Sequence, residues 1–405
     1  MDYKHLVQGE CYFLGNNQAR QYEYLTKDID CEVAIIGGGV TGAILGHYFT
    51  KKNVDTVILE KERIAHGSSS ITTSLLQYEL DENADALMEM LSANDIALAY
   101  ELGLFALEEL RDIIKAYGNK CYYKKVDCLL YSAKKDRVKQ IVKEYEFRKS
   151  HGFDVSLLDE GNKDFDIDFE MALLSRGGGA VLNPFLFAHM LIDESRDRGL
   201  RVYENSEVIK IDYDSNNEGA TVECSYGKKV RCKKVILASG YNTESFINRN
   251  FGTKYITYNL VSEALNVGER FAGTIFRDDN DPYHYFRTTH DGRVIFGGED
   301  NLYVDDIEME KLSERYYDKL ETTMKSVLKK YHLSVKYRCL GAFTTTKDNL
   351  GFIGVSPEHK NLWLCLGYGA NGILFSMLGG YFLSELYIGN EHRGMNLFKI
   401  DRFDK

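Results

Sequence analysis

The stretch EVAIIGGGVTG, residues 32–42, decides the fold class of this chain. It begins with Glu32–Ile36, a mainly apolar run of strand length, and its glycines precede a pattern typical of a helix. A second apolar run, Thr56–Leu59, follows the helix and ends at Glu60. Strand, tight turn, helix and strand in this order predict the βαβ unit of an α/β, Rossmann-like sheet that binds a dinucleotide.

The three spaced glycines of this turn have different tasks. Gly37 permits the tight turn, Gly39 lets the backbone approach a pyrophosphate, and Gly42 lets the helix pack closely on the strand. The helix N-terminus then points at the phosphates. Glu60 follows at the usual spacing of about 20 residues and is expected to accept hydrogen bonds from the ribose hydroxyls. A carboxylate there disfavours a 2′-phosphate, so we do not expect NADP.

NAD and FAD share this fingerprint, and three other features favour FAD. They are the polar loop Gly67–Ser69 soon after Glu60, the strand 235–238 that ends at Ser239-Gly240, and the glycine-rich turn 367–372. That last turn precedes a helix whose N-terminus would face a ligand. A helix dipole so placed can stabilise the negative charge of reduced flavin. The sequence therefore predicts FAD.

Composition excludes several other classes of protein. Lys and Arg number 50 against 61 Asp and Glu, a net charge of −11, which argues against a nucleic-acid partner. The eight cysteines show no zinc-type spacing, so no metal site is expected. The N-terminus lacks the pattern of a secretory signal, which suggests the cytoplasm. The most apolar segment, 362–388, contains several glycines and Glu385, so we expect no membrane span.

Further stretches of the chain match one known family. They are LEK at 59–61, GSS at 67–69, VILASG at 235–240, DGR at 291–293, GGED at 297–300, TKDNLGFIG at 346–354 and GYGANG at 367–372. With residues 33–42, they make the chain resemble the D-amino-acid oxidase and glycine oxidase type of FAD-dependent oxidoreductase, from Asp30 to about Ile388. The leading stretch further resembles a bacterial branch in which some members carry a C-terminal Rieske domain. This chain ends at Lys405, so we expect no such domain in it.

The resemblance implies a division into domains. It implies a Rossmann-like FAD domain interrupted twice by an α+β substrate domain on a mixed or antiparallel sheet, with the isoalloxazine between them. We expect the FAD-binding domain at residues 28–95, 165–250 and 338–405. The substrate-binding domain is expected at 96–164 and 251–337, after an N-terminal extension at 1–27.

The resemblance also implies which residues contact the cofactor. These are Gly37, Gly39, Val40, Thr41, Gly42, Glu60, Lys61, Gly67, Ser68, Ser69, Val208, Ala238, Ser239, Gly240, Gly341, Gly367, Gly369, Asn371, Gly372 and Ile373. In relatives with covalent flavin, the linking cysteine matches Gly341 and the linking histidine matches Ile71. Neither residue here can form the link, so noncovalent FAD is expected.

The substrate side departs from the family pattern. An arginine that binds the substrate carboxylate in amino-acid oxidases of the family matches Phe343 here, and a phenyl ring cannot replace a bidentate guanidinium. Arg287 could hold an anionic substrate instead, or it could form an ion pair on the sheet. Tyr258 and Tyr285 are candidates for the lining of the substrate cavity. These four residues form the predicted catalytic set.

The resemblance implies oxidation of a C–N bond by hydride transfer to flavin N5. The substrate would be a neutral amine or amino-acid derivative, and water would hydrolyse the imine product. Two other functions stay open: a dehydrogenase of a hydroxy acid or polyol phosphate on the same fold, and a non-catalytic electron-transfer flavoprotein. The electron acceptor is either oxygen or a protein, and the sequence does not choose between them.

Overall fold

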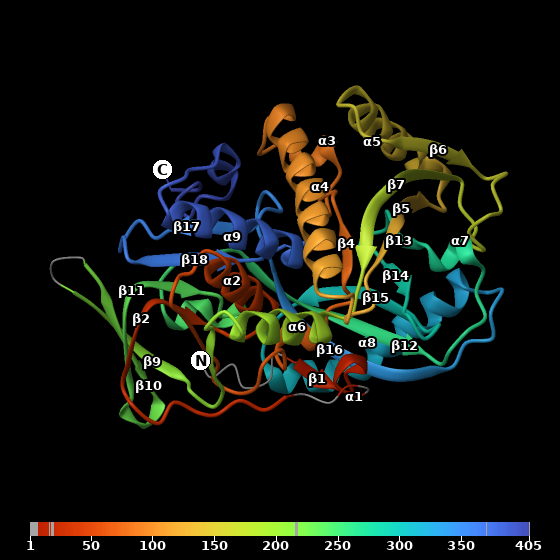
Figure 1. Ribbon diagram of the computed structural model, residues 1–405. Helices are drawn as coiled ribbons and strands as arrows, with labels where there is room; N and C mark the ends of the chain where they lie inside the picture. The colour runs from red at the N-terminus through yellow and green to blue at the C-terminus, as the bar shows by residue number, and fades with distance from the viewer. Residues whose placement is uncertain (1–6, 16, 18–19, 215–217, 370, 405) are drawn as a thin grey trace.

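A computed structural model describes residues 7–15, 17, 20–214, 218–369 and 371–404, with the backbone alone for 306–310. The chain forms two β-sheets with helices packed against both (Figure 1). Among the described residues, one sheet has eight strands and the other has ten. The predicted α/β class, a Rossmann-like sheet combined with a second domain on a mixed sheet, is confirmed.

The eight-stranded sheet is built around β2 (Ile29–Ile36), and its main order is β17-β18-β11-β2-β3-β8. The strands on both sides of β2 are parallel to it: β11 and then β18 on one side, β3 and then β8 on the other. The strand β17 is antiparallel to β18. The bounds of the strands other than β2 are β3 Thr56–Leu59, β8 Arg201–Tyr203, β9 Val208–Tyr213, β10 Ala220–Cys224, β11 Lys229–Leu237, β17 Phe352–Val355 and β18 Leu362–Leu366.

Both faces of β2 are buried, which explains its uninterrupted apolar run. Val33 and Ile35 belong to the core that contains the helices α2 (Val40–Lys51), α6 (Pro184–Arg196) and α9 (Gly372–Tyr387). Ala34 and Ile36 belong to a second core on the opposite face. The predicted βαβ unit is therefore present, with α2 between β2 and β3.

The ten-stranded sheet has the order β1-β16-β12-β15-β14-β13-β5-β7-β4, with β6 paired to β7. Only the pair β13–β5 is parallel among its described strands. The bounds are β1 Val7–Gly9, β4 Leu75–Gln77, β5 Lys124–Ser132, β6 Val155–Asp159, β7 Met171–Val181, β12 Thr253–Ser262, β13 Thr274–Asp278, β14 Tyr285–Thr288, β15 Val294–Leu302 and β16 Val335–Thr345.

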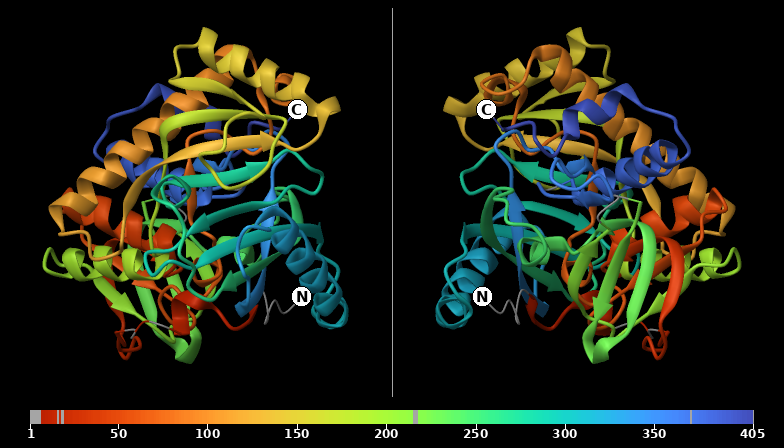
Figure 2. Two further views of the ribbon diagram at one scale, coloured as in Figure 1. Left: turned by 90° about the vertical axis from the view of Figure 1, so that its right-hand side faces the viewer. Right: turned by 90° about the vertical axis from the view of Figure 1, so that its left-hand side faces the viewer.

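Helices cover the two ends of this sheet. The helix α8 (Asp306–Val327) packs on β12, β15 and β16, whereas α5 (Val138–Ser150) packs on β5, β6 and β7 (Figure 2). The remaining α-helices are α1 Tyr12–Gly15, α3 Ala84–Leu87, α4 Ala93–Ala116 and α7 Glu269–Ala272. Within the described part of the chain, every helix is too short or too polar to cross a membrane.

The sheets do not follow the predicted domain boundaries at three places. The strands β4, β7 and most of β16 lie in segments that we assigned to the FAD-binding domain, yet all three pair in the ten-stranded sheet. Strand propensity shows that a segment is extended, but it does not show which sheet the strand joins. The division into two domains stays a prediction. In the structure, the chain passes from one sheet to the other near these strands.

Candidate active site

A cavity of about 850 Å³ lies between the two sheets. On one side it is lined by the loops that follow β2, β3, β11 and β18, at the carboxyl ends of the parallel strands. This is the edge at which open α/β sheets bind ligands. On the other side it is lined by residues of β12, β14, β15 and β16. Its volume is typical of cofactor sites, which measure about 300–1,000 Å³.

The glycine turn after β2 has the shape that a phosphate-binding loop requires. Gly37 has φ +111°, and a Cβ there would lie 2.4 Å from the carbonyl oxygen of Ala238. A Cβ on Gly42 would lie 2.0 Å from the carbonyl oxygen of Gly37. A Cβ on Gly39 would meet only Ser69 Oγ, at 3.0 Å, because this residue faces the cavity. The close backbone contacts fix the turn, and the open side fits a pyrophosphate.

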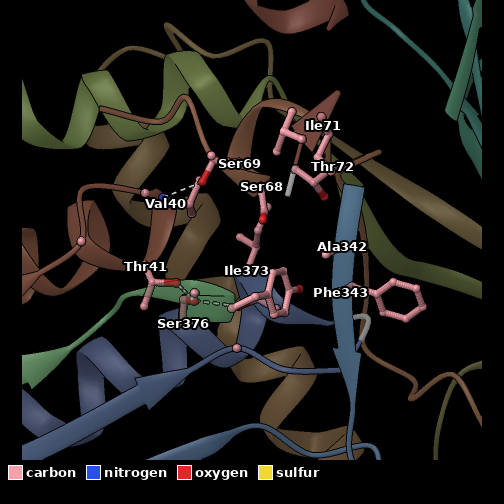
Figure 3. A pocket seen from close by; sticks show the side chains of 18 of the residues that line it. Val40, Thr41, Ser68, Ser69, Ile71, Thr72, Ala342, Phe343, Ile373 and Ser376 are labelled. Carbon is pink, nitrogen blue, oxygen red and sulfur yellow. Dashed lines mark hydrogen bonds between the residues drawn. The ribbon is translucent and has the colours of Figure 1, made fainter. Parts of the chain in front are cut away.

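Two helices begin at this cavity. The Val40 N–H at the start of α2 donates to Ser69 Oγ over 3.0 Å, and Thr41 Oγ1 lies 2.7 Å from Ser376 Oγ in the first turns of α9 (Figure 3). The Asn371 side chain, just before α9, donates to the carbonyl oxygen of Glu79. Both helix N-termini carry partial positive charge, so both favour the anionic groups of a dinucleotide.

Glu60 occupies the end of β3 as predicted. Its Oε2 accepts from the Gly38 N–H over 2.7 Å and its Oε1 accepts from the Glu62 N–H over 2.9 Å. Burial raises the pKa of this carboxyl. A carboxylate has about four acceptor positions, so capacity for ribose hydroxyls remains. Since Glu60 also lines the cavity, its placement fits the adenosine end of FAD.

Most of the predicted cofactor residues come together around this cavity. Those that line it are Gly37, Gly39, Val40, Thr41, Glu60, Lys61, Gly67, Ser68, Ser69, Val208, Ala238, Ser239, Gly240, Gly367, Gly369, Asn371, Gly372 and Ile373. Gly42 lies behind the turn, and Gly341 lies within β16 opposite Val7 and Thr257. Ala370, in the middle of the last glycine-rich turn, lies outside the described residues.

Arg287 does not face this cavity, which differs from the prediction. Its side chain is 3% exposed, and its guanidinium donates to the carbonyl oxygens of Thr73 (2.7 Å), Leu182 (3.1 Å) and Thr288 (3.4 Å). It lines a separate cavity of about 340 Å³. These carbonyl bonds hold the side chain in the protein interior. Among the described residues Arg287 forms no ion pair, and the prediction that it holds an anionic substrate stays a prediction.

The two candidate tyrosines lie on opposite faces of the sheet. Tyr258 is fully buried under α8, where its ring stacks on Tyr316 at 4.9 Å between centroids. Its strand neighbour Thr257 faces the cavity, as side chains alternate along a strand. Tyr285 does line the cavity, and its hydroxyl lies 2.7 Å from Thr257 Oγ1. Tyr258 is therefore a core residue, whereas Tyr285 belongs to the site.

Phe343 lines the cavity from β16. Its ring packs on Tyr255, with 5.8 Å between centroids, and extends from the strand away from Ile373 and Ser376 (Figure 3). The position that matches the carboxylate-binding arginine of the family therefore presents only apolar surface here.

A group of polar and charged residues that the sequence did not single out also lines the cavity. Asp81, Arg277, Tyr283 and Asp300 all line it. The Tyr283 hydroxyl donates to Asp81 Oδ2 over 2.6 Å, and Arg277 donates to the carbonyl oxygen of Asp81. Burial raises the pKa of Asp81, and it raises the pKa of Asp300 to about 7. Arg277 is the register partner of Tyr285, so only the pairing of β13 with β14 could have revealed it.

Comparisons with known proteins agree with this site. The family model described as "FAD dependent oxidoreductase" matches residues 32–386. A putative Rieske iron–sulfur protein of Bacillus subtilis is 22% identical over 97% of this chain and 76% of its own. The gamma-glutamylputrescine oxidoreductase of Escherichia coli is 26% identical over 94% and 89%. Glycine oxidase from Geobacillus kaustophilus has the same fold, with a TM-score of 0.75 at 19% identity over 92% and 99% of the two chains. Because the family model covers most of the sequence, this chain belongs to the DAO family of FAD-dependent oxidoreductases.

Proposed function

We propose that this enzyme oxidises the C–N bond of an amine or amino-acid derivative to an imine. The observation that carries the proposal is the cavity, which joins a dinucleotide-binding turn to a sheet face bearing carboxyl and phenol groups. The names of the relatives support the choice of a nitrogen substrate, since they include gamma-glutamylputrescine oxidoreductase and glycine oxidase. Bound FAD supplies the hydride acceptor. Oxygen or a protein then takes the electrons.

The residues around the cavity fit a noncovalently bound FAD. The turn at Gly39 leaves room at a helix N-terminus for the pyrophosphate, and Glu60 offers acceptors to the ribose. Gly341 and Ile71, at the positions of the covalent links, carry no nucleophile. We therefore expect acid or heat to release the flavin into the supernatant, which its absorbance would show. Flavin that stays with the precipitated protein would contradict this expectation.

Asp300 is our candidate for the group that prepares the substrate. An ammonium has no lone pair to assist hydride departure, so the amine must lose a proton first. Asp300 lines the cavity, and its Oδ1 has no hydrogen-bond partner among the described residues. Its raised pKa, about 7, lets the carboxyl hold or accept a proton near neutral pH. We infer that Asp300 takes the proton of the substrate ammonium. Tyr285 and Thr257, whose hydroxyls contact each other, form part of the cavity wall.

Product analysis after one turnover tests the proposed reaction. The protein with bound FAD is mixed without oxygen with an amine substrate and, in a separate reaction, with the matching alcohol, and the products are measured against the flavin reduced. C–N oxidation followed by hydrolysis requires one carbonyl product and one equivalent of ammonia, or of a smaller amine, for each flavin. A carbonyl product formed from an alcohol, with no nitrogen released, would instead support a hydroxy-acid or polyol-phosphate dehydrogenase.

A further inference from the structure

Two cysteines that the proposed reaction does not use meet at the wall of the cavity. Cys11 follows β1 and Cys339 lies in β16, opposite Gly9 in the antiparallel register. The Glu10 N–H donates to the carbonyl oxygen of Arg338 over 2.9 Å, which extends the pairing toward Cys11. With Ile71 the two cysteines form a small buried cluster, and Cys11 also lines the cavity. A small molecule in the cavity therefore has access to Cys11.

The two thiols lie in one buried cluster, and Ser70 Oγ donates to Cys11 Sγ over 3.9 Å. The neighbouring Cys339 thiol lowers the pKa of Cys11, whereas the Cys11 thiol and burial raise the pKa of Cys339. Cys11 is therefore the thiol of the two that loses its proton more readily. Such a pair suits thiol–disulfide exchange, in which a thiolate attacks and a second thiol completes the reaction.

We propose that Cys11 and Cys339 form a reversible disulfide by exchange with a small-molecule disulfide. The Cys11 thiolate attacks one sulfur of that disulfide, forms a mixed disulfide and expels a thiolate. Cys339 then loses its proton and attacks the Cys11 sulfur, which forms the protein disulfide and expels the second thiolate. Two protein thiols are oxidised, and one small disulfide is reduced to two thiols.

The bond would join two walls of the cofactor cavity. Val7, Gly9, Cys11 and Leu14 line the cavity from the N-terminal segment, and Ala342 and Phe343 line it from β16. In the structure these segments are held together near the cysteines by the short β1–β16 pairing. A covalent tie between them would oppose separation of the walls. We therefore expect slower release of FAD from the disulfide form, whichever substrate the enzyme oxidises.

A second cysteine pair provides an internal control. Cys31 in β2 and Cys232 in β11 are register partners, and the Cys232 thiol donates to the carbonyl oxygen of Ala220 over 3.6 Å. The neighbouring Cys232 thiol and burial both raise the pKa of Cys31, and neither cysteine lines the cavity. This pair is therefore adjacent in the sheet but has no access from the cavity. Proximity alone would link both pairs, whereas our proposal links only Cys11 and Cys339.

The experiment treats the FAD-bound protein with 2-hydroxyethyl disulfide. The remaining thiols are then alkylated, and peptides are mapped by mass spectrometry without reduction. We expect loss of two of the eight free thiols, a linked Cys11–Cys339 peptide that disappears on reduction, and unlinked Cys31 and Cys232. In Cys339→Ser, Cys11 should carry the mixed disulfide, which keeps the test valid if the crosslinked form proves short-lived. Cys11 and Cys339 that both remain alkylatable after the treatment would overturn the proposal, as would linkage of both pairs at equal rates.

Discussion

Gly39 precedes α2 and Gly42 lies in the first turn of that helix, yet substitutions at these two glycines should fail in different ways. Gly39 has an ordinary φ of −74°, and its Cβ would meet only Ser69 Oγ, whereas a Cβ on Gly42 would clash with backbone. We expect Gly39→Val to fold and lose FAD, because its side chain occupies the pyrophosphate position. Gly42→Val should lose the fold of the turn itself. Flavin content and circular dichroism of both variants separate these outcomes. Normal flavin content in Gly39→Val would refute the assignment of this turn.

Asp300 couples stability to pH, because burial raises the pKa of its carboxyl from 3.8 to about 7. A raised folded-state pKa means that the folded protein binds the proton more tightly. The stabilising contribution is therefore complete below the unfolded pKa and is lost as the pH rises through the folded one. We expect the free energy of unfolding of the wild type to fall relative to that of Asp300→Asn between about pH 4 and pH 7. Urea unfolding of both proteins across this range measures the difference, and a difference that does not vary with pH would contradict the shift.

The cofactor residues and the substrate-side residues of the site differ in how well the sequence predicts them. The glycines and Glu60 were predictable, since their task depends on a local turn whose spacing is visible in the sequence. The substrate-side residues were not predictable, because the face of the sheet that each side chain occupies depends on strand register. The sequence alone does not distinguish Tyr258 from Tyr285 as a cavity residue. Only the pairing of β12, β14 and β15 places Tyr258 in the core and Tyr285 at the cavity.

At the scale of elements, α5 is fastened to the ten-stranded sheet by a buried cation. Arg148 is fully buried, and it pairs with Glu144 at 2.6 Å and with Glu79, just beyond β4, at 3.2 Å. Arg148→Met would leave two carboxylates buried without their cation. We expect a loss of about 3–5 kcal/mol in the free energy of unfolding.

The matched control for Arg148 lies on the nearby surface. Arg176 pairs with Asp154 at 3.3 Å, with both side chains more than half exposed. Exposed pairs contribute about 0.2–1 kcal/mol, so Arg176→Met should change stability little. Denaturant titration of both variants compares the two sites. Equal losses of unfolding free energy in the two variants would show that burial does not strengthen the contribution of the Arg148 ion pairs to stability.

The predicted elements near the glycine turn were correct because the βαβ unit is local in sequence. The predicted domain boundaries departed from the sheets where the chain crosses between them, at β4, β7 and β16. The strand β7 contains three consecutive glycines, and the partners of β4 and β16 lie far away along the chain. Which sheet each strand joins is decided by long-range packing, which a local pattern does not record.

On the scale of the whole molecule, the cavity is an inter-sheet site. The eight-stranded sheet supplies the cofactor side through loops after four strands, and the ten-stranded sheet supplies the face with Asp300, Tyr285 and Phe343. Cofactor and substrate would meet where these walls face each other. The family assignment shows that FAD is the cofactor. The central claim to be measured is that the bond oxidised there is a C–N bond.

Anaerobic reduction of the bound flavin by matched substrate pairs tests that claim most directly. Each pair would share one carbon skeleton and differ only in nitrogen or oxygen: an amino acid with its hydroxy acid, and an amine with its alcohol. We expect loss of the oxidised-flavin absorbance with at least one nitrogen compound and no loss with its oxygen counterpart. Reduction by the hydroxy acid or alcohol, with the nitrogen compounds inert, would contradict it.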